Sequence, residues 1–184
     1  IIAAAGFIIP KTSSRSITSP SGTSDTMEVI ANVSFPVNDI KKIVNKTNGC
    51  MVWGGAVNLA AADDKLIRVR NPLGLDPEGM LLASIIAKKA AVNATHVLIE
   101  IPVGKNSKVE NKQKAVGLKN KFIQLGKKFN IKVIIMFSDG NQPVGNGIGP
   151  GLEARDVLKV LQGTGPEDLR EKGLKTAAML LKLL

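Results

Sequence analysis

Val97-Leu98-Ile99-Glu100-Ile101 is an apolar run of strand length, and Val133-Ile134-Ile135-Met136-Phe137 is another. Apolar runs of this length are typical of parallel strands that are buried on both faces. Between them, hydrophobic residues such as Leu118 and Phe122 recur at helical spacing over residues 111–129. The sequence therefore predicts a right-handed βαβ unit, in which this helix joins the two strands.

The remainder of the chain alternates short apolar runs with longer amphipathic segments. This alternation predicts an α/β fold with a mostly parallel central sheet flanked by helices. Helix starts are expected near Asp25, near Asn38 and at Asp76-Pro77-Glu78, where a capping residue or proline precedes an amphipathic segment. We expect residues 1–165 to form the central α/β domain and residues 166–184 to form a terminal helix that begins a further segment.

The bulk composition is that of an ordinary globular protein. The chain has 184 residues, of which 44% are hydrophobic, and its longest apolar runs fall far short of the ~20 residues that a membrane span needs. Residue 1 is Ile, and no basic segment of a signal peptide precedes the apolar start. We expect a cytoplasmic fragment of a longer protein, with no membrane contact.

Cysteine and histidine are too rare for several kinds of chemistry. The single cysteine, Cys50, excludes an internal disulfide and a cysteine-based metal cluster. The single histidine, His96, excludes paired histidine ligands, and its place before an apolar run favours a packed strand-start residue. No metal site and no cofactor are expected.

The net charge of +10 raises the alternative of a nucleic-acid-binding domain. Nine lysines lie between Lys105 and Lys132, so the excess is concentrated. Aromatic residues for base stacking are scarce, however, because the chain has no Tyr and one Trp. Most of these lysines lie off the apolar face of the predicted helix, which favours a solvated surface that steers anionic substrates.

A segment rich in hydroxyl groups lies near the start of the chain, Ser13-Ser14-Arg15-Ser16-Ile17-Thr18-Ser19-Pro20-Ser21-Gly22-Thr23-Ser24-Asp25-Thr26-Met27-Glu28. Hydroxyls, a guanidinium and free amides at a helix start are the groups that bind a phosphate. A flexible loop with a helix cap is the alternative interpretation. The glycine-rich segment 145–151 lacks both the lysine of a P-loop and the G-x-G-x-x-G spacing, which favours a structural loop there.

The pattern Ser-x-Arg followed by Gly-Thr-x-Asp-x-x-Glu resembles the signature of the class II nucleoside phosphorylases. The resemblance covers essentially the whole chain and is greatest to the archaeal AMP phosphorylase branch. Where the thymidine-type branch has a histidine in its signature, this chain has Ser19. The resemblance implies phosphorolysis of a nucleoside 5′-monophosphate, and it places the family's glycine-rich phosphate loop upstream of Ile1.

The resemblance also implies which residues form the site. Asp76 matches the proton donor to the leaving base, whereas an aspartate at a helix N-cap would have a lowered pKa and a purely structural role. Ser13 and Lys88 are further candidates by likeness to the thymidine-type branch. The residues that match substrate-binding positions are Ser14, Arg15, Ser16, Ile17, Thr18, Ser19, Thr23, Ser84 and Lys108.

The expected reaction converts AMP and inorganic phosphate, the co-substrate, to adenine and ribose 1,5-bisphosphate. A thymidine or pyrimidine-nucleoside phosphorylase is the alternative within the family, and a basic nucleic-acid-binding domain is the alternative outside it. A fragment that folds but is inactive alone is a further alternative. The expected partners are AMP or a related nucleotide, phosphate and, in the full-length protein, a second copy of the chain.

Overall fold

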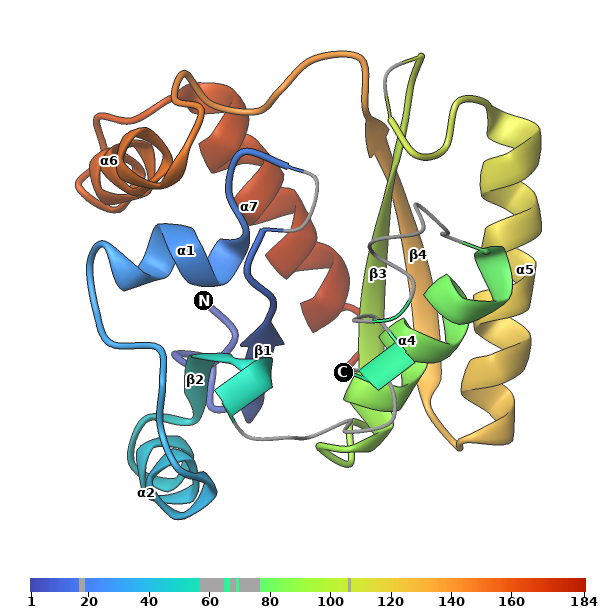
Figure 1. Cartoon of the computed structure of the whole chain (residues 1–184), viewed down its shortest axis with the longest axis horizontal. Coiled ribbons are helices and arrows are strands. Elements are labelled where there is room, and N and C mark those ends of the chain that lie inside the picture. The colour runs from blue at the N-terminus through green and yellow to red at the C-terminus, as the bar shows by residue number, and fades with distance from the viewer. Residues whose placement is uncertain (17–18, 57–64, 67–68, 70–76, 106) are drawn as a thin grey trace. The chain divides into compact units, whose positions relative to one another are not determined.

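The computed structural model describes residues 1–16, 19–56, 65–66, 69, 77–105 and 107–184. The chain divides into two compact units (Figure 1). Unit 1 consists of residues 1–73 and 145–173, and unit 2 consists of residues 74–144 and 174–184. The domain boundary expected at residue 165 stays a prediction.

Unit 1 is built on a pair of parallel strands. Strand β1 lies beside β2, with Ile9 aligned to Gly49 and Ser13 aligned to Trp53. Helices α1 and α2 lie in the connection between these strands, and α6 follows the return of the chain to this unit. The elements of unit 1 are β1 (Ile9–Ser13), α1 (Thr23–Glu28), α2 (Val37–Thr47), β2 (Gly49–Trp53), η1 (Gly54–Ala56) and α6 (Pro150–Leu161).

Pro10 lies within β1, although a proline cannot donate a hydrogen bond to a neighbouring strand. The amide of Ile9 donates to the carbonyl of Asn48 at 2.8 Å, so the amide positions facing β2 are those of alternate residues. The nitrogen of Pro10 therefore faces away from β2, where no ladder bond is lost.

Unit 2 contains the βαβ arrangement that the two apolar runs predict. Strands β3 and β4 are parallel over eight residues each, from His96 aligned with Lys132 to Val103 aligned with Asp139. Helix α5 joins them, and the Asn111 side chain caps it by accepting a hydrogen bond from the Lys114 amide at 2.9 Å. The elements of unit 2 are α4 (Glu78–Ala90), β3 (His96–Val103), α5 (Lys112–Lys128) and β4 (Lys132–Asp139). Helix α7 (Glu167–Leu181) begins in unit 1 and ends in unit 2.

The largest hydrophobic cluster of the described residues lies in unit 2. Alternate residues of β3 are buried, and they pack with the apolar faces of α4 and α5. One face of β3 is therefore fully covered, whereas the other is only half-buried. The cluster consists of Leu82, Ile86, Val97, Ile99, Ile101, Val109, Ala115, Leu118, Phe122 and Ile131.

The α/β class with parallel strands is confirmed, and the described strands form two pairs, β1 with β2 and β3 with β4. All three expected helix caps differ from the observed ones by one to three residues, and α2 has Pro36 at its N-cap where Asn38 was expected. Helix α1 has Gly22 at its N-cap and Asp25 inside its first turn, and α4 has Pro77 at its N-cap. Asp76 therefore precedes the cap of α4, and its own position lies outside the described residues.

Candidate functional site

The hydroxyl-rich segment runs from the end of β1 into α1 in unit 1, and residues 14–16 and 19–22 form the described part of the loop between them. The loop closes where Gly22 meets its beginning, because a Cβ atom on Gly22 would lie 2.5 Å from the carbonyl oxygen of Ser14. The Ser24 amide donates to that same carbonyl at 3.4 Å, and the hydroxyls of Ser13 and Ser24 are 2.5 Å apart. Ser24 is fully buried. The neck of the loop is therefore fixed by backbone and serine contacts.

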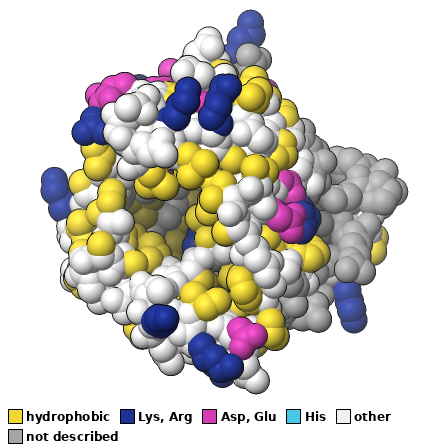
Figure 2. Space-filling model, turned by 90° about the vertical axis from the view of Figure 1, so that its left-hand side faces the viewer, with side chains coloured by type: hydrophobic (Ala, Val, Ile, Leu, Met, Phe, Trp, Pro, Cys, Tyr) yellow, Lys and Arg dark blue, Asp and Glu magenta, His cyan; other side chains and the backbone are white. Residues whose placement is uncertain are grey.

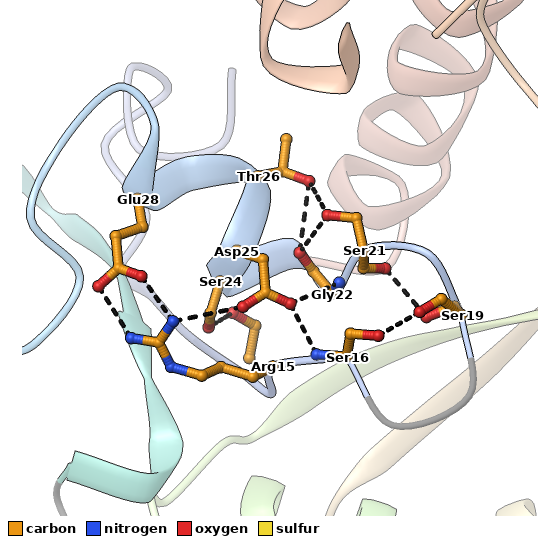
Figure 3. Close-up of polar contacts among 10 residues, drawn as sticks. Arg15, Ser16, Ser19, Ser21, Gly22, Ser24, Asp25, Thr26 and Glu28 are labelled. Atoms are coloured by element: carbon orange, nitrogen blue, oxygen red, sulfur yellow. Dashed lines mark hydrogen bonds and ion pairs between the residues drawn. The ribbon is translucent and has the colours of Figure 1, made fainter. Parts of the chain in front are cut away.

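The Asp25 side chain is bonded to the backbone amides that the sequence analysis expected to be free at the start of the helix. Its Oδ2 atom accepts hydrogen bonds from the backbone amides of Ser16 at 2.7 Å and Gly22 at 2.9 Å (Figure 3). These two bonds, with a smaller contribution from Arg15, hold the pKa of Asp25 below its ordinary value. The Asp25 carboxylate thus accepts the hydrogen bonds of backbone amides that the sequence analysis expected to bind a phosphate.

Arg15 is likewise engaged by carboxylates. Its Nη1 and Nη2 atoms lie 2.5 and 2.8 Å from the two carboxylate oxygens of Glu28, and Nη1 lies 3.3 Å from Asp25 Oδ1 (Figure 3). The guanidinium also lies over the Trp53 ring, 4.7 Å from its centroid. The hydrogen bond from Arg15 lowers the pKa of Glu28, and the two carboxylates raise the pKa of Arg15.

The loop hydroxyls differ in whether they are already bonded. Ser16 donates to the carbonyl of Ser19, Ser19 donates to the carbonyl of Ser21 at 3.0 Å, and Ser21 lies 2.8 Å from the Thr26 hydroxyl. The side chains of Ser14 and Thr23 are exposed, and neither makes a hydrogen bond to another residue that the structure describes. Among the described loop residues, these two hydroxyls are therefore exposed and not engaged by a described neighbour.

Carboxylates also hold the glycine-rich segment that precedes α6. The buried side chain of Asp156 accepts hydrogen bonds from the amides of Asn146 at 2.7 Å and Gly147 at 2.6 Å. Glu153 bonds the Gly149 amide at 3.1 Å and, through its other oxygen, the Thr26 hydroxyl at 2.9 Å. These contacts favour a structural role for the segment and tie α6 to α1.

A shallow, open depression of about 470 Å³ lies beside α1 in unit 1. Two carboxylates, those of Asp25 and Glu28, are part of its lining, together with Pro20, Val29 and Pro150. This lining repels anions, so the depression does not suit a phosphate. The exposed hydroxyls of Ser14 and Thr23 are not part of it.

Three further candidates lie in unit 2. Ser84 is only 7% exposed on α4, so little of its side chain is open to a ligand in this conformation. Lys88 follows one turn later on the same helix and is half-buried. Lys108 is exposed, in the loop that follows the carboxyl end of β3. The remaining candidates, Ile17, Thr18 and Asp76, lie outside the described residues.

The loop that carries Lys108 is held against the loop after β4. The Lys105 amide donates to the side-chain oxygen of Asn141 at 3.0 Å, and Asp139 in turn accepts from the Asn141 side chain at 2.7 Å. Ser107 bonds the carbonyls of Gly104 and Val109 at 2.9 and 2.7 Å. The carboxyl ends of parallel strands are where open α/β sheets bind ligands, so Lys108 sits on a supported loop at such an edge.

Sequence reasoning missed four of these supporting residues. Glu28 and Trp53 hold Arg15, and Ser107 and Asn141 hold the loop of Lys108. Glu28 is part of the Ser-x-Arg … Gly-Thr-x-Asp-x-x-Glu pattern, so the sequence contained a signal that its carboxylate could pair with Arg15. Trp53, Ser107 and Asn141 carried no comparable signal, because their partners are distant in sequence or belong to the backbone.

Comparison with known proteins finds a family match for the first part of the chain. Residues 1–77 match the glycosyl transferase family, a/b domain. The matched region makes up 77 of the 184 residues of the chain. Within that match lie the whole hydroxyl-rich loop and Asp76.

Similarity to nucleoside phosphorylases extends beyond this glycosyl transferase domain, over the entire chain. The chain is 53% identical over 185 residues to "Putative thymidine phosphorylase 2" of Acidovorax sp. (strain JS42), covering 100% of this chain and 36% of that protein. It is 51% identical over 183 residues to AMP phosphorylase 1 of Archaeoglobus fulgidus, covering 99% of this chain and 36% of that protein. AMP phosphorylase of Methanococcus maripaludis (strain C5) is 51% identical over 185 residues, with coverages of 100% and 37%. The chain therefore spans little more than a third of the length of these curated relatives.

The membrane-spanning potential of the helices and the distribution of surface charge concern the alternatives to an enzymatic function. No helix of the described residues is long and apolar enough to cross a membrane. On the face shown in Figure 2, lysine and arginine side chains are scattered among hydrophobic and polar ones rather than gathered in one patch. On α5, Lys121 pairs with Glu78, and Lys114 lies 3.6 Å from Glu110. These ion pairs engage two of the nine lysines between Lys105 and Lys132, and the nucleic-acid alternative stays a prediction.

Proposed function

We propose that this chain is part of a phosphorylase that cleaves the N-glycosidic bond of nucleoside 5′-monophosphates, with AMP as the preferred substrate. The observation that carries the proposal is the similarity of the entire chain, at 51% identity, to AMP phosphorylases of two archaea. The chain has Ser19 where the resemblance gives the thymidine-type branch a histidine, which supports the nucleotide over the nucleoside.

In the proposed reaction, an oxygen of inorganic phosphate attacks the anomeric carbon of the ribose while the bond from that carbon to the base breaks. The base leaves with the bonding electron pair and takes a proton from Asp76, giving adenine and ribose 1,5-bisphosphate. A positioned acid accelerates such a step because it avoids expelling a free base anion. The reaction needs no metal and no cofactor beyond the phosphate co-substrate.

The loop between β1 and α1 supplies the polar groups on the substrate side of this proposal. Ser14 and Thr23 offer exposed hydroxyls that no other described residue engages. Lys108 offers a cation on a loop that Ser107 and Asn141 support. Hydroxyls in unit 1 and, separately, a lysine in unit 2 are groups that bind phosphate, because each oxygen of a phosphate accepts hydrogen bonds.

The direct test is release of adenine from AMP, with and without phosphate, followed by chromatography and detection of the phosphorylated sugar. AMP phosphorylase 1 of Archaeoglobus fulgidus serves as the positive control. Calorimetric titration with AMP runs beside the assay, so that binding is measured even where turnover is absent. Phosphate-dependent release, or saturable AMP binding that Thr23→Val weakens and Ser34→Ala leaves unchanged, supports the proposal. The absence of both adenine release and AMP binding would overturn the proposal.

A thymidine or pyrimidine-nucleoside phosphorylase is the second candidate. It is favoured by the 53% identity to a protein carrying the thymidine phosphorylase name. The two candidates differ in their need for a 5′-phosphate. Thymidine and uridine are therefore compared with AMP, CMP and UMP at equal concentration, and faster phosphorolysis of the unphosphorylated nucleosides would favour the second candidate.

A further inference from the structure

Arg15 belongs to a group of charged side chains with a net negative charge. One guanidinium faces the two carboxylates of Asp25 and Glu28, at distances from 2.5 to 3.3 Å. Both terminal nitrogens are bonded to Glu28 in a bidentate pair, which fixes the orientation of the guanidinium as well as its position. A phosphate that approached Arg15 would have to share the guanidinium with two carboxylates, whose negative charges repel it.

Trp53 is the third side chain that contacts the Arg15 guanidinium. It is the last residue of β2 and is aligned with Ser13, the residue from which the loop leaves β1. The backbone of Trp53 is anchored by a 2.8 Å hydrogen bond to the carbonyl of the buried Val33. Gly55 leaves space for the indole, because a Cβ atom there would lie 2.7 Å from two ring carbons. The guanidinium thus lies over an aromatic ring that the strand holds in place.

We propose that Arg15 is a positioning residue, held by Glu28 and Trp53, which braces the hydroxyl-rich loop and does not itself bind phosphate. This inference rests on the proposed function and assigns its phosphate contacts within unit 1 to hydroxyl groups, foremost those of Ser14 and Thr23. Arg15 follows Ser14 directly, and Asp25 bonds both Arg15 and the next amide in the loop, that of Ser16. Loss of the brace therefore loosens the segment that carries Ser14.

A double-mutant cycle separates a brace from a phosphate clamp. The variants are Arg15→Gln, Glu28→Gln and the double variant, and Lys42→Gln is the control because it removes the same charge from an exposed ion pair on α2. A brace predicts that each single variant raises the KM for AMP by a similar factor, about 3- to 10-fold, with kcat changed less than about 3-fold. The double variant should then be no worse than either single variant, and Lys42→Gln should match the unmodified protein.

A phosphate clamp predicts the opposite pattern. Arg15→Gln would raise the KM for AMP or phosphate on the order of 10- to 100-fold, as expected for lost hydrogen bonds to a charged group. Glu28→Gln would leave that KM unchanged or lower it, because it frees the guanidinium. This pattern would overturn the proposal.

Fluorescence gives a readout that does not depend on activity. Trp53 is the only tryptophan of the chain, so its emission reports directly on the ring beneath Arg15. A brace predicts that Arg15→Gln and Glu28→Gln shift the emission and lower Tm by similar amounts, non-additively in the double variant, whereas Lys42→Gln changes neither. Unchanged emission in Glu28→Gln, or additive changes in Tm, would overturn the brace. If the unmodified protein releases no adenine and binds no AMP, the proposed function fails, and this cycle still decides the role of Arg15.

Discussion

Gly22 is the residue at which the loop tolerates the least change. A Cβ atom there would lie 2.5 to 2.6 Å from backbone atoms of Ser14, Arg15 and Ser16. Because backbone atoms cannot rotate away as a side chain would, we expect Gly22→Ala to lower the free energy of unfolding by about 1–3 kcal/mol. Denaturant unfolding measures this difference.

Gly173 provides the matched control for that measurement. It lies exposed in α7, and a Cβ atom there would meet nothing within 4 Å. Gly173→Ala should leave stability unchanged or raise it by up to about 1 kcal/mol, since alanine favours a helix interior. Equal effects of the two substitutions would show that the close approach at Gly22 is not what limits the loop.

Asp76 is the residue on which the proposed chemistry depends. Asp76→Asn should lower kcat for AMP phosphorolysis by about 100-fold or more, because an amide cannot donate the proton that the leaving base needs. Its Tm should stay close to that of the unmodified protein. Steady-state kinetics measure the effect, with Asp39→Asn on the exposed face of α2 as the control. An Asp76→Asn variant with unchanged kcat would contradict the role of Asp76 as the proton donor to the leaving base.

At the scale of elements, the contact of α1 with the preceding loop should depend on pH through Asp25. Two backbone amides stabilise its carboxylate in the folded state and lower its pKa, so the ionised form favours folding. The stabilisation is fully present above the ordinary pKa of about 3.9 and is lost as the pH falls through the lower folded value. The gap in Tm between the unmodified protein and Asp25→Asn should therefore be constant near pH 6 and close as the pH falls below about 4. A gap that widened in acid would contradict the assignment.

Among the elements, those with strong local periodicity were predicted well. The helix expected over residues 111–129 is α5, Lys112–Lys128, and its joined strands are β3 and β4. Phe129, counted with the apolar face, is instead 55% exposed at the C-cap, where the helix has already ended. The start of α1 was placed too late because Asp25 looks like an N-cap in sequence. The true cap, Gly22, is selected by close contact with Ser14, which no local pattern records.

At the scale of the whole molecule, the net charge of +10 should act on association with substrate. The positive electrostatic field of the protein attracts a dianionic substrate. Salt screens this attraction, and the Debye length is about 10 Å at 0.1 M ionic strength. We expect kcat/KM for AMP to fall several-fold between about 0.02 and 0.3 M salt. The neutral nucleoside adenosine is the control, and kcat/KM for it should change little. An equal fall for both substrates would indicate a general salt effect rather than steering.

The sequence by itself determined the α/β class and the parallel pair of β3 and β4, because periodicity is a local property of the chain, and its motifs supplied the candidate site residues by resemblance. Only the tertiary structure decided which of those residues are open to a ligand. Arg15 looks like a phosphate clamp in sequence, but Glu28, Asp25 and Trp53 all contact its guanidinium once β1, β2 and α1 are assembled. Ser14 and Thr23 look like their neighbours in sequence, yet their hydroxyls stay exposed while those of Ser16, Ser19 and Ser21 are bonded within the loop. The physical reason is that ligand and protein compete for the same hydrogen-bond donors, and a hydroxyl is available to a ligand where no group of the folded chain already accepts its hydrogen bond.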